Sequence, residues 1–142
     1  MRNMMQSRTK APAVSTVLVV DDEAPIRAVQ RRVLEDDGYC VLEASNGAEG
    51  IDLLAGDAPL DLLIADLDMP VLSGDEMVRC VRLARPDLRV LYVTGHIDRL
   101  MDARPLWDGE AFLEKPFSGA GLREAVSLLL HGTIGRRGVG AT

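Results

Sequence analysis

The sequence predicts an α/β fold, a three-layer sandwich in which a five-stranded parallel sheet lies between two layers of helices. Two observations predict it. Short runs of β-branched and aliphatic residues recur along the chain, the clearest being TVLVV at 16–20, and segments with apolar residues at helical spacing separate them. Strands that alternate with helices pair in parallel through right-handed crossovers, which places helices on both faces of the sheet.

Five segments are predicted to be strands because they are short and largely apolar. They are residues 16–20, 39–44, 60–65, 89–93 and 111–113. The continuous apolar character of the first run is typical of a strand that is buried on both faces. This pattern favours a central sheet with a hydrophobic core on each side.

Four helices are predicted with clear signals. Pro25 suits the first turn of a helix that ends at Asp37-Gly38, a second helix spans 46–55, and a last one spans 119–130. Ser73 and Glu76 have the spacing of a capping box at the start of the third. The residues expected to face the core are Ile26, Val29, Val33 and Leu34, then Ala48, Ile51 and Leu53 or Leu54, then Met77, Val78, Val81 and Leu83 or Ala84.

The remaining helix, between the fourth and fifth strands, is predicted to be short or bent. Residues 97–103 have room for about two turns. Pro105 then interrupts the helix, the bulky Trp107 follows, and Asp108-Gly109 indicates a turn.

Residues 16–131 are predicted to form one domain, with flexible ends at 1–15 and 132–142, which are basic and aperiodic. The chain carries 22 acidic and 16 basic side chains, and all the acidic ones lie between residues 21 and 124. Such a surface repels phosphate backbones, so direct binding of nucleic acid is not expected.

No apolar run suits a membrane helix or a secretory signal. Cys40 and Cys80 are expected to be buried, reduced thiols of a cytoplasmic protein.

Polar side chains follow four of the predicted strands at the point where each strand ends. They are Asp21-Asp22-Glu23 after the first, Asp66 after the third, Thr94 after the fourth and Lys115-Pro116 after the fifth. In an open parallel sheet these carboxyl ends meet along one edge, where ligands bind. Converging carboxylates repel one another unless a cation neutralises them, and oxygen ligands with open positions suit Mg²⁺.

A carboxylate in such a site can act as a nucleophile toward a phosphoryl group. A lysine and a hydroxyl would complete the charge balance during transfer. Lys115 is the one lysine inside the predicted domain of a chain with 14 arginines, which indicates a position that needs a point charge. Each of these residues alone has an ordinary structural explanation, so the shared location carries the prediction.

Four motifs, in this order, resemble the receiver domains of two-component response regulators, the CheY-like family. The motifs are VVDDE at 19–23, DLDMP at 66–70 followed by SG at 73–74, TG at 94–95, and FLEKPF at 112–117. The resemblance covers about residues 16–131. It implies a flavodoxin-like sheet with strand order 2-1-3-4-5.

By this resemblance Asp66 is the residue that accepts the phosphoryl group. Asp22 and Asp66 would bind Mg²⁺ directly, and the backbone carbonyl of Asp68 would be a further protein ligand. Asp21 would help to place the metal through a water molecule. The resemblance therefore implies a phosphoryl-accepting magnesium site at the edge of the sheet.

The resemblance also implies a switch. Thr94 and Lys115 would hold phosphate oxygens, with Thr94 moving toward the phosphate and the rotamer of Phe112 reporting that movement. The Lys115–Pro116 peptide bond would be cis. Asp68 and His96 would flank the approach of water and tune the lifetime of the aspartyl phosphate, although Asp68 could equally cap a turn and His96 could simply be exposed.

The sequence disfavours three alternative functions. The DLD motif at 66–68 is similar to that of haloacid-dehalogenase-like phosphatases, but the Asp21-Asp22 pair precedes it and no cap domain is evident. A phosphorylation-independent binding module is disfavoured because the residues needed for phosphorylation are all present. A flavin-binding module is disfavoured because no loop rich in Ser, Thr and Gly follows the first strand.

The expected protein is therefore not a turnover enzyme. It would catalyse transfer to itself from the phosphohistidine of a sensor histidine kinase or a histidine phosphotransfer protein, and would then lose the phosphoryl group by autodephosphorylation. The irregular segment around Pro105 disfavours dimerisation through that helix. We expect a monomer that acts on an unknown downstream protein, with residues 97–112 as the contact surface.

Overall fold

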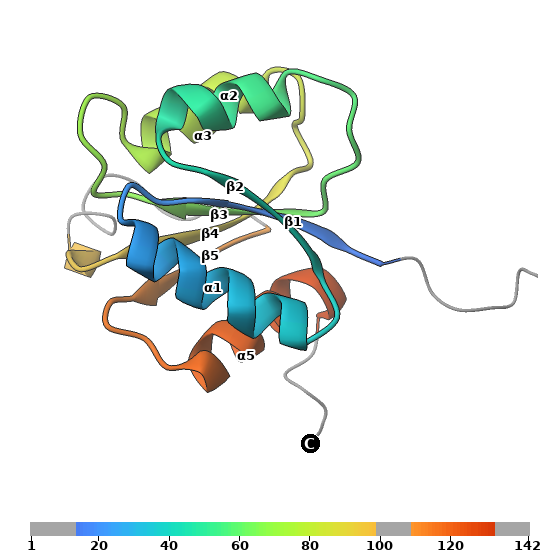
Figure 1. Ribbon diagram of the computed structural model, residues 1–142. Helices are drawn as coiled ribbons and strands as arrows, with labels where there is room; N and C mark the ends of the chain where they lie inside the picture. Colours follow the sequence, from blue (N-terminus) through green and yellow to red (C-terminus); the bar gives the residue numbers. More distant parts are fainter. Residues whose placement is uncertain (1–13, 99–108, 133–142) are drawn as a thin grey trace, which may run out of the picture.

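The computed structural model describes residues 14–98 and 109–132. Its centre is a parallel sheet of order β2-β1-β3-β4-β5, with helices on both faces (Figure 1). The strands are β1 (Thr16–Val20), β2 (Cys40–Ala44), β3 (Leu62–Asp66), β4 (Arg89–Thr94) and β5 (Glu110–Glu114). The predicted fold class and strand order are confirmed. The second and third strands begin one and two residues later than predicted.

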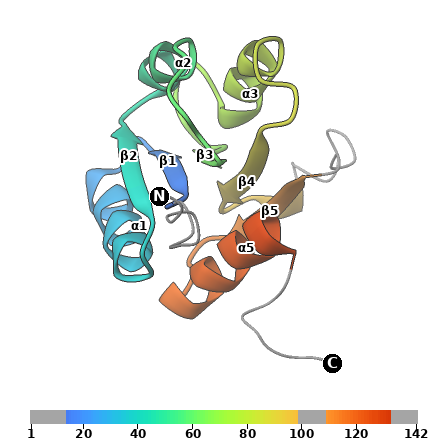
Figure 2. The same cartoon turned by 90° about the vertical axis from the view of Figure 1, so that its right-hand side faces the viewer.

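The helices form two layers. Helices α2 (Gly47–Leu54) and α3 (Gly74–Arg82) cover one face of the sheet, whereas α1 (Ala24–Asp36) and α5 (Gly119–His131) cover the other (Figures 1 and 2). Successive residues of β1 point to opposite faces, so Leu18 and Val20 join the core under α2 and α3 while Val17 and Val19 join the other. This explains why residues 17–20 of β1 are all apolar.

The helix ends follow local chemistry. The predicted capping box is present: the Ser73 hydroxyl accepts a hydrogen bond from the Glu76 N–H, and the Glu76 carboxylate accepts one from the Ser73 N–H. The side chains of Asn46 and Ser118 cap α2 and α5 in the same position. Helix α5 ends at His131 and is capped by Gly132, whose φ of 72° is left-handed and favours glycine.

Several expected core positions were wrong. Val29 is 53% exposed and Leu83 is 91% exposed, whereas the side chain of Gln30 is buried. Ala48 and Ala84 are also exposed. Each residue turns a helix by about 100°, so an error of one position in the predicted rotation of a helix moves a residue from the core face to its edge.

The two cysteines are free, as predicted, but exposed rather than buried. Cys40 begins an edge strand and Cys80 lies on the outer side of α3.

The predicted short or bent helix at 97–103, together with Pro105 and Trp107, lies largely outside the described residues, as do most of the ends predicted to be flexible. No helix within residues 14–98 and 109–132 is long and apolar enough to cross a membrane.

Candidate functional site

The carboxyl ends of β1, β3, β4 and β5 meet at one edge of the sheet. Asp21 directly follows β1, and Asp66 and Thr94 are the last residues of β3 and β4. All three are at most 1% exposed. Lys115 directly follows β5, and its N–H donates to the carbonyl of Thr94 at 2.8 Å, which continues the β4–β5 ladder. Parallel pairing therefore brings together residues that are up to 94 positions apart in the sequence.

Lys115 is the cation at the centre of this edge. Its Nζ lies 3.4 Å from Oδ2 of Asp66 and 3.5 Å from Oδ2 of Asp21. It also lies 3.5 Å from Oε2 of Glu23. These distances exceed those of a charge-assisted hydrogen bond, about 2.8 Å, so the ammonium group balances three carboxylates without being tightly bound to one.

Asp21 and Asp66 are held in the same way. Oδ1 of Asp21 accepts the N–H of Glu23 at 2.8 Å, and Oδ1 of Asp66 accepts the N–H of Asp68 at 2.9 Å. Each forms an Asx turn that fixes the side chain to its own loop. The second oxygen of each, Oδ2, is buried and makes no hydrogen bond within the described part of the chain. Buried polar atoms normally have hydrogen-bond partners, whereas these two oxygens have only the longer ion pairs with Lys115, so they can still bind a ligand.

Burial and neighbouring charges shift the pKa values of the residues in the site. Burial raises the pKa of Asp66 to about 6, with the charge of Asp21 adding to the effect and the N–H of Asp68 and the Lys115 ammonium opposing it. Burial likewise raises the pKa of Asp21. Burial alone would lower the pKa of Lys115, but the charges of Asp66 and Asp21 outweigh it, so that pKa is raised and the ammonium form is stabilised.

These residues fit a divalent cation. Asp21, Asp22, Glu23 and Asp66 each offer a carboxylate oxygen, and the four oxygens lie within 4.8 Å of one another. Asp22 and Glu23 are exposed, whereas Asp21 and Asp66 are buried, so the cluster opens to solvent on one side. A hard cation with oxygen ligands and retained waters suits such a half-open set. It would also relieve the repulsion among the carboxylates.

The side chains of Thr94 and Asp68 are hydrogen-bonded to each other. Thr94 Oγ1 donates to Oδ2 of Asp68 at 3.0 Å, and the N–H of Gly95 donates to the same oxygen at 3.1 Å. Oγ1 of Thr94 also accepts the N–H of His96 at 2.8 Å, and the residue His96 is exposed. Asp68 therefore holds the turn that follows β4, in addition to lying two residues beyond Asp66.

Comparison with known proteins identifies the family. The family model described as response regulator receiver domain matches residues 17–127. The chain belongs to this family. It is 31% identical to the sensor kinase CckA of Brucella abortus over 89% of this chain, which spans 14% of that protein. It is 36% identical to the response regulator MprA of Mycolicibacterium vanbaalenii over 87% of this chain and 54% of that protein.

A solved receiver has the same fold. The structure of the chemotaxis protein CheY4 of Vibrio cholerae matches with a TM-score of 0.73 and 30% identity, covering 83% of this chain and all of that one. The chain thus spans about half or less of the two relatives above but all of the chain in this solved structure. It is a receiver domain of two-component signal transduction, and the haloacid-dehalogenase-like phosphatase and the phosphorylation-independent binding module are not favoured.

Two residues of this receiver gain a role from the structure that the sequence did not assign. Glu23 was expected at the end of the first strand, and in the structure it contributes an oxygen to the acidic cluster and pairs with Lys115. The glycine of the SG motif has a steric reason. A Cβ on Gly74 would lie 2.5 Å from the backbone oxygen of Asp66, so glycine lets α3 begin directly against the residue expected to be the acceptor.

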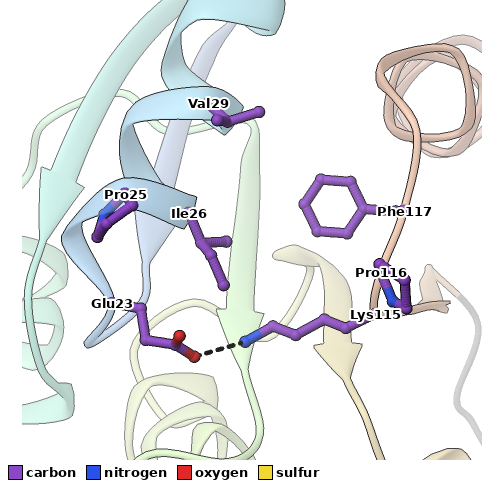
Figure 3. Close-up of a pocket in the computed structure, with 7 residues that line it drawn as sticks. All are labelled: Glu23, Pro25, Ile26, Val29, Lys115, Pro116 and Phe117. Atoms are coloured by element: carbon purple, nitrogen blue, oxygen red, sulfur yellow. Dashed lines mark ion pairs between the residues drawn. The ribbon is translucent and has the colours of Figure 1, made fainter.

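The other predicted switch residues are located as follows. Phe112 lies on β5 and is 39% exposed. The Lys115–Pro116 peptide bond is cis, as the resemblance implied. Beside this peptide bond, a groove of about 560 Å³ runs between the start of α1 and the segment after β5 (Figure 3). It is lined by Glu23, Pro25, Ile26, Val29, Lys115, Pro116 and Phe117.

Proposed function

We propose that this receiver accepts a phosphoryl group on Asp66 from the phosphohistidine of a sensor histidine kinase or a histidine phosphotransfer protein. One observation carries the proposal: Oδ2 of Asp66 is buried without a hydrogen bond, 3.4 Å from the Lys115 ammonium and within a cluster of carboxylates. A carboxylate oxygen that makes no hydrogen bond and faces a cation is placed to attack an incoming phosphoryl group.

The transfer is a substitution at phosphorus. Oδ2 of Asp66 forms the new P–O bond while the P–N bond of the phosphohistidine breaks, and the leaving imidazole nitrogen keeps the electron pair and takes up a proton. The pKa of Asp66, about 6, leaves most of the carboxyl ionised and nucleophilic at neutral pH. Lys115 faces the attacking oxygen and would hold a phosphate oxygen afterwards, and Thr94 would hold another once it releases Asp68.

Mg²⁺ is the metal proposed for the cluster, held by Asp22, Asp66 and the backbone carbonyl of Asp68, with Asp21 acting through water. Bound there, it would supply positive charge against the carboxylates and the phosphate oxygens. The two unsatisfied Oδ2 atoms and the half-open carboxylate set support this proposal.

The direct test is labelling with a small phosphodonor, such as phosphoramidate, in the presence and absence of Mg²⁺. Intact-mass measurement should show one phosphoryl group per chain with Mg²⁺ and little with a chelator. Steady turnover of a phosphomonoester without accumulation of a labelled protein would indicate a phosphatase and contradict the proposal.

Asp68→Asn is expected to slow autodephosphorylation several-fold while leaving phosphorylation intact. The amide keeps an acceptor for the Thr94 hydroxyl but removes the carboxylate that would activate or orient water near Asp66. Release of phosphate from the isolated phosphoprotein would be timed against wild type, with His96→Ala measured in parallel. Unchanged rates in both variants would leave Asp68 with a turn-holding role only and His96 with none.

The apolar groove of Figure 3 is proposed as the contact for the phosphodonor protein. Glu23 and Lys115 line both the groove and the acidic site, so a protein that brings phosphohistidine to Asp66 must cover it. Its other lining residues are apolar, and Val29 is 53% exposed without a partner in the core. An apolar helix face on the donor would match this surface.

Val29→Ser is therefore expected to lower the efficiency of phosphotransfer from the cognate donor protein by about three- to tenfold, as for loss of about 1 kcal/mol of apolar contact. Labelling by phosphoramidate should be unchanged. Leu53→Ser on α2 is a matched control, because Leu53 is 43% exposed on the opposite layer. Equal loss in both variants, or none in Val29→Ser, would remove the groove from the donor interface.

A further inference from the structure

Arg27, on the second turn of α1, joins three elements at the back of the acidic site. Its Nη1 donates to the backbone oxygen of Asp21 at 2.7 Å, and its Nε donates to Oε1 of Glu43 on β2 at 3.0 Å. The side chains of Arg27 and Glu43 are only 18% and 27% exposed. A guanidinium group has a fixed planar geometry, so two bonds in different directions orient it and the groups it contacts.

The peptide that Arg27 contacts is the one that leads to Asp22. The N–H of Asp21 is already bonded to the carbonyl of Ala44 on β2 at 3.2 Å. Arg27 adds a bond to the Asp21 carbonyl, so the backbone is held on both sides of the Asp21 Cα. Rotation of this peptide would move the Asp22 carboxylate relative to Asp66. Four carboxylate oxygens lie within 4.8 Å of one another, so repulsion would favour a rotation that separates them.

We propose that Arg27, fixed by Glu43, is a positioning residue that holds the Asp21–Asp22 peptide against this repulsion and so preorganises the acidic cluster for its cation. The inference rests on the proposed Mg²⁺ site and adds to it a residue that touches neither the metal nor the phosphoryl group. Preorganisation strengthens binding because the cost of ordering the ligands is met before the ion arrives.

Charge alone and a positioning role predict opposite changes in Mg²⁺ affinity when Arg27 is removed. Arg27 is a cation near a cation site, so its removal should tighten Mg²⁺ binding if only Coulomb forces matter. If Arg27 positions the peptide, its removal should weaken binding. The sign of the change distinguishes the two.

Arg31 is the matched control. It is also on α1 and pairs with Glu43, through the other carboxylate oxygen, and with Glu35 at 3.0 Å. No contact between Arg31 and the Asp21 carbonyl is present in the described residues. Arg31→Ala therefore removes one positive charge that pairs with Glu43, as Arg27→Ala does, but it leaves the hydrogen bond to the Asp21 carbonyl in place.

Calorimetric titration of Mg²⁺ into the full chain tests the proposal. Arg27→Ala should weaken Mg²⁺ binding about fivefold, the change that corresponds to one net hydrogen bond, whereas Arg31→Ala should stay within about twofold of wild type. Arg27→Lys should also weaken binding, because one ammonium group cannot replace both bonds of the fork. This second variant keeps the charge and serves if Arg27→Ala does not fold. Glu43→Gln should weaken Mg²⁺ binding in the wild-type background. It should have no further effect on Mg²⁺ binding in an Arg27→Ala background, because the two residues act as one unit.

The outcomes separate the two proposals. A wild-type chain that does not bind Mg²⁺ would overturn the proposed metal site itself. Wild-type binding together with equal or tighter binding by Arg27→Ala and Arg27→Lys, or equal weakening by Arg31→Ala, would overturn the positioning role alone.

Discussion

Asp66→Asn is expected to abolish stable phosphoryl addition from phosphoramidate and from a cognate phosphohistidine donor. The amide is nearly the same size and still accepts the N–H of Asp68, but its oxygen is not a competent nucleophile toward phosphorus. Intact-mass measurement after a fixed incubation with Mg²⁺ would show the loss. Asp87→Asn, which changes an exposed aspartate before β4, should label like wild type. An undiminished mass gain in Asp66→Asn would assign the acceptor to another residue.

The same substitution should stabilise the metal-free fold at neutral pH. A carboxyl whose pKa is raised in the folded protein binds its proton more tightly there than in the unfolded chain. The wild-type free energy of unfolding therefore falls as the pH rises from the ordinary value of 3.8 through about 6, and the loss is complete above that range. Urea denaturation in a chelator at pH 5 and pH 8 should show a smaller decrease for Asp66→Asn than for wild type.

Asp22→Ala is expected to weaken Mg²⁺ binding at least about tenfold. Asp22 is the exposed carboxylate next to the two buried ones, and with Asp66 it is one of the two side chains proposed to bind the metal directly. Its removal also reduces repulsion within the cluster, so the metal-free protein should lose no stability and should gain some at low salt. Calorimetric Mg²⁺ titration and urea denaturation measure the two effects independently.

The control for Asp22→Ala is Asp52→Ala, which removes the same charge from the exposed side of α2, away from the site. It corrects for the change in overall charge. Equal Mg²⁺ affinity in Asp22→Ala and wild type would exclude Asp22 as a ligand, and a large loss of stability in the chelator would show that its role is structural.

The sequence alone predicted the layout of this receiver and the edge of the sheet where the proposed site residues meet. The apolar run of β1, the Ser73 capping box and the polar residues that end four strands depend on neighbours in the chain, so local patterns predicted them correctly. Parallel pairing then required the strand ends to meet, which is why Asp66 and Lys115 could be expected side by side.

Only the tertiary structure decided which contacts those residues make. Glu23 pairs with Lys115, 92 positions away, and Asp68 bonds to Thr94, 26 positions away. Arg27 reaches the Asp21 carbonyl because of how α1 is rotated about its axis, and the same rotation buries Gln30 and exposes Val29. A periodic pattern of apolar residues predicts the rotation of a helix about its axis only to within about one residue, or 100°. A hydrogen bond requires its donor and acceptor to be placed to within a few tenths of an ångström, so the pattern cannot predict it. Packing against the sheet and against α5 supplies the remaining precision, and it does so through contacts that no local pattern records.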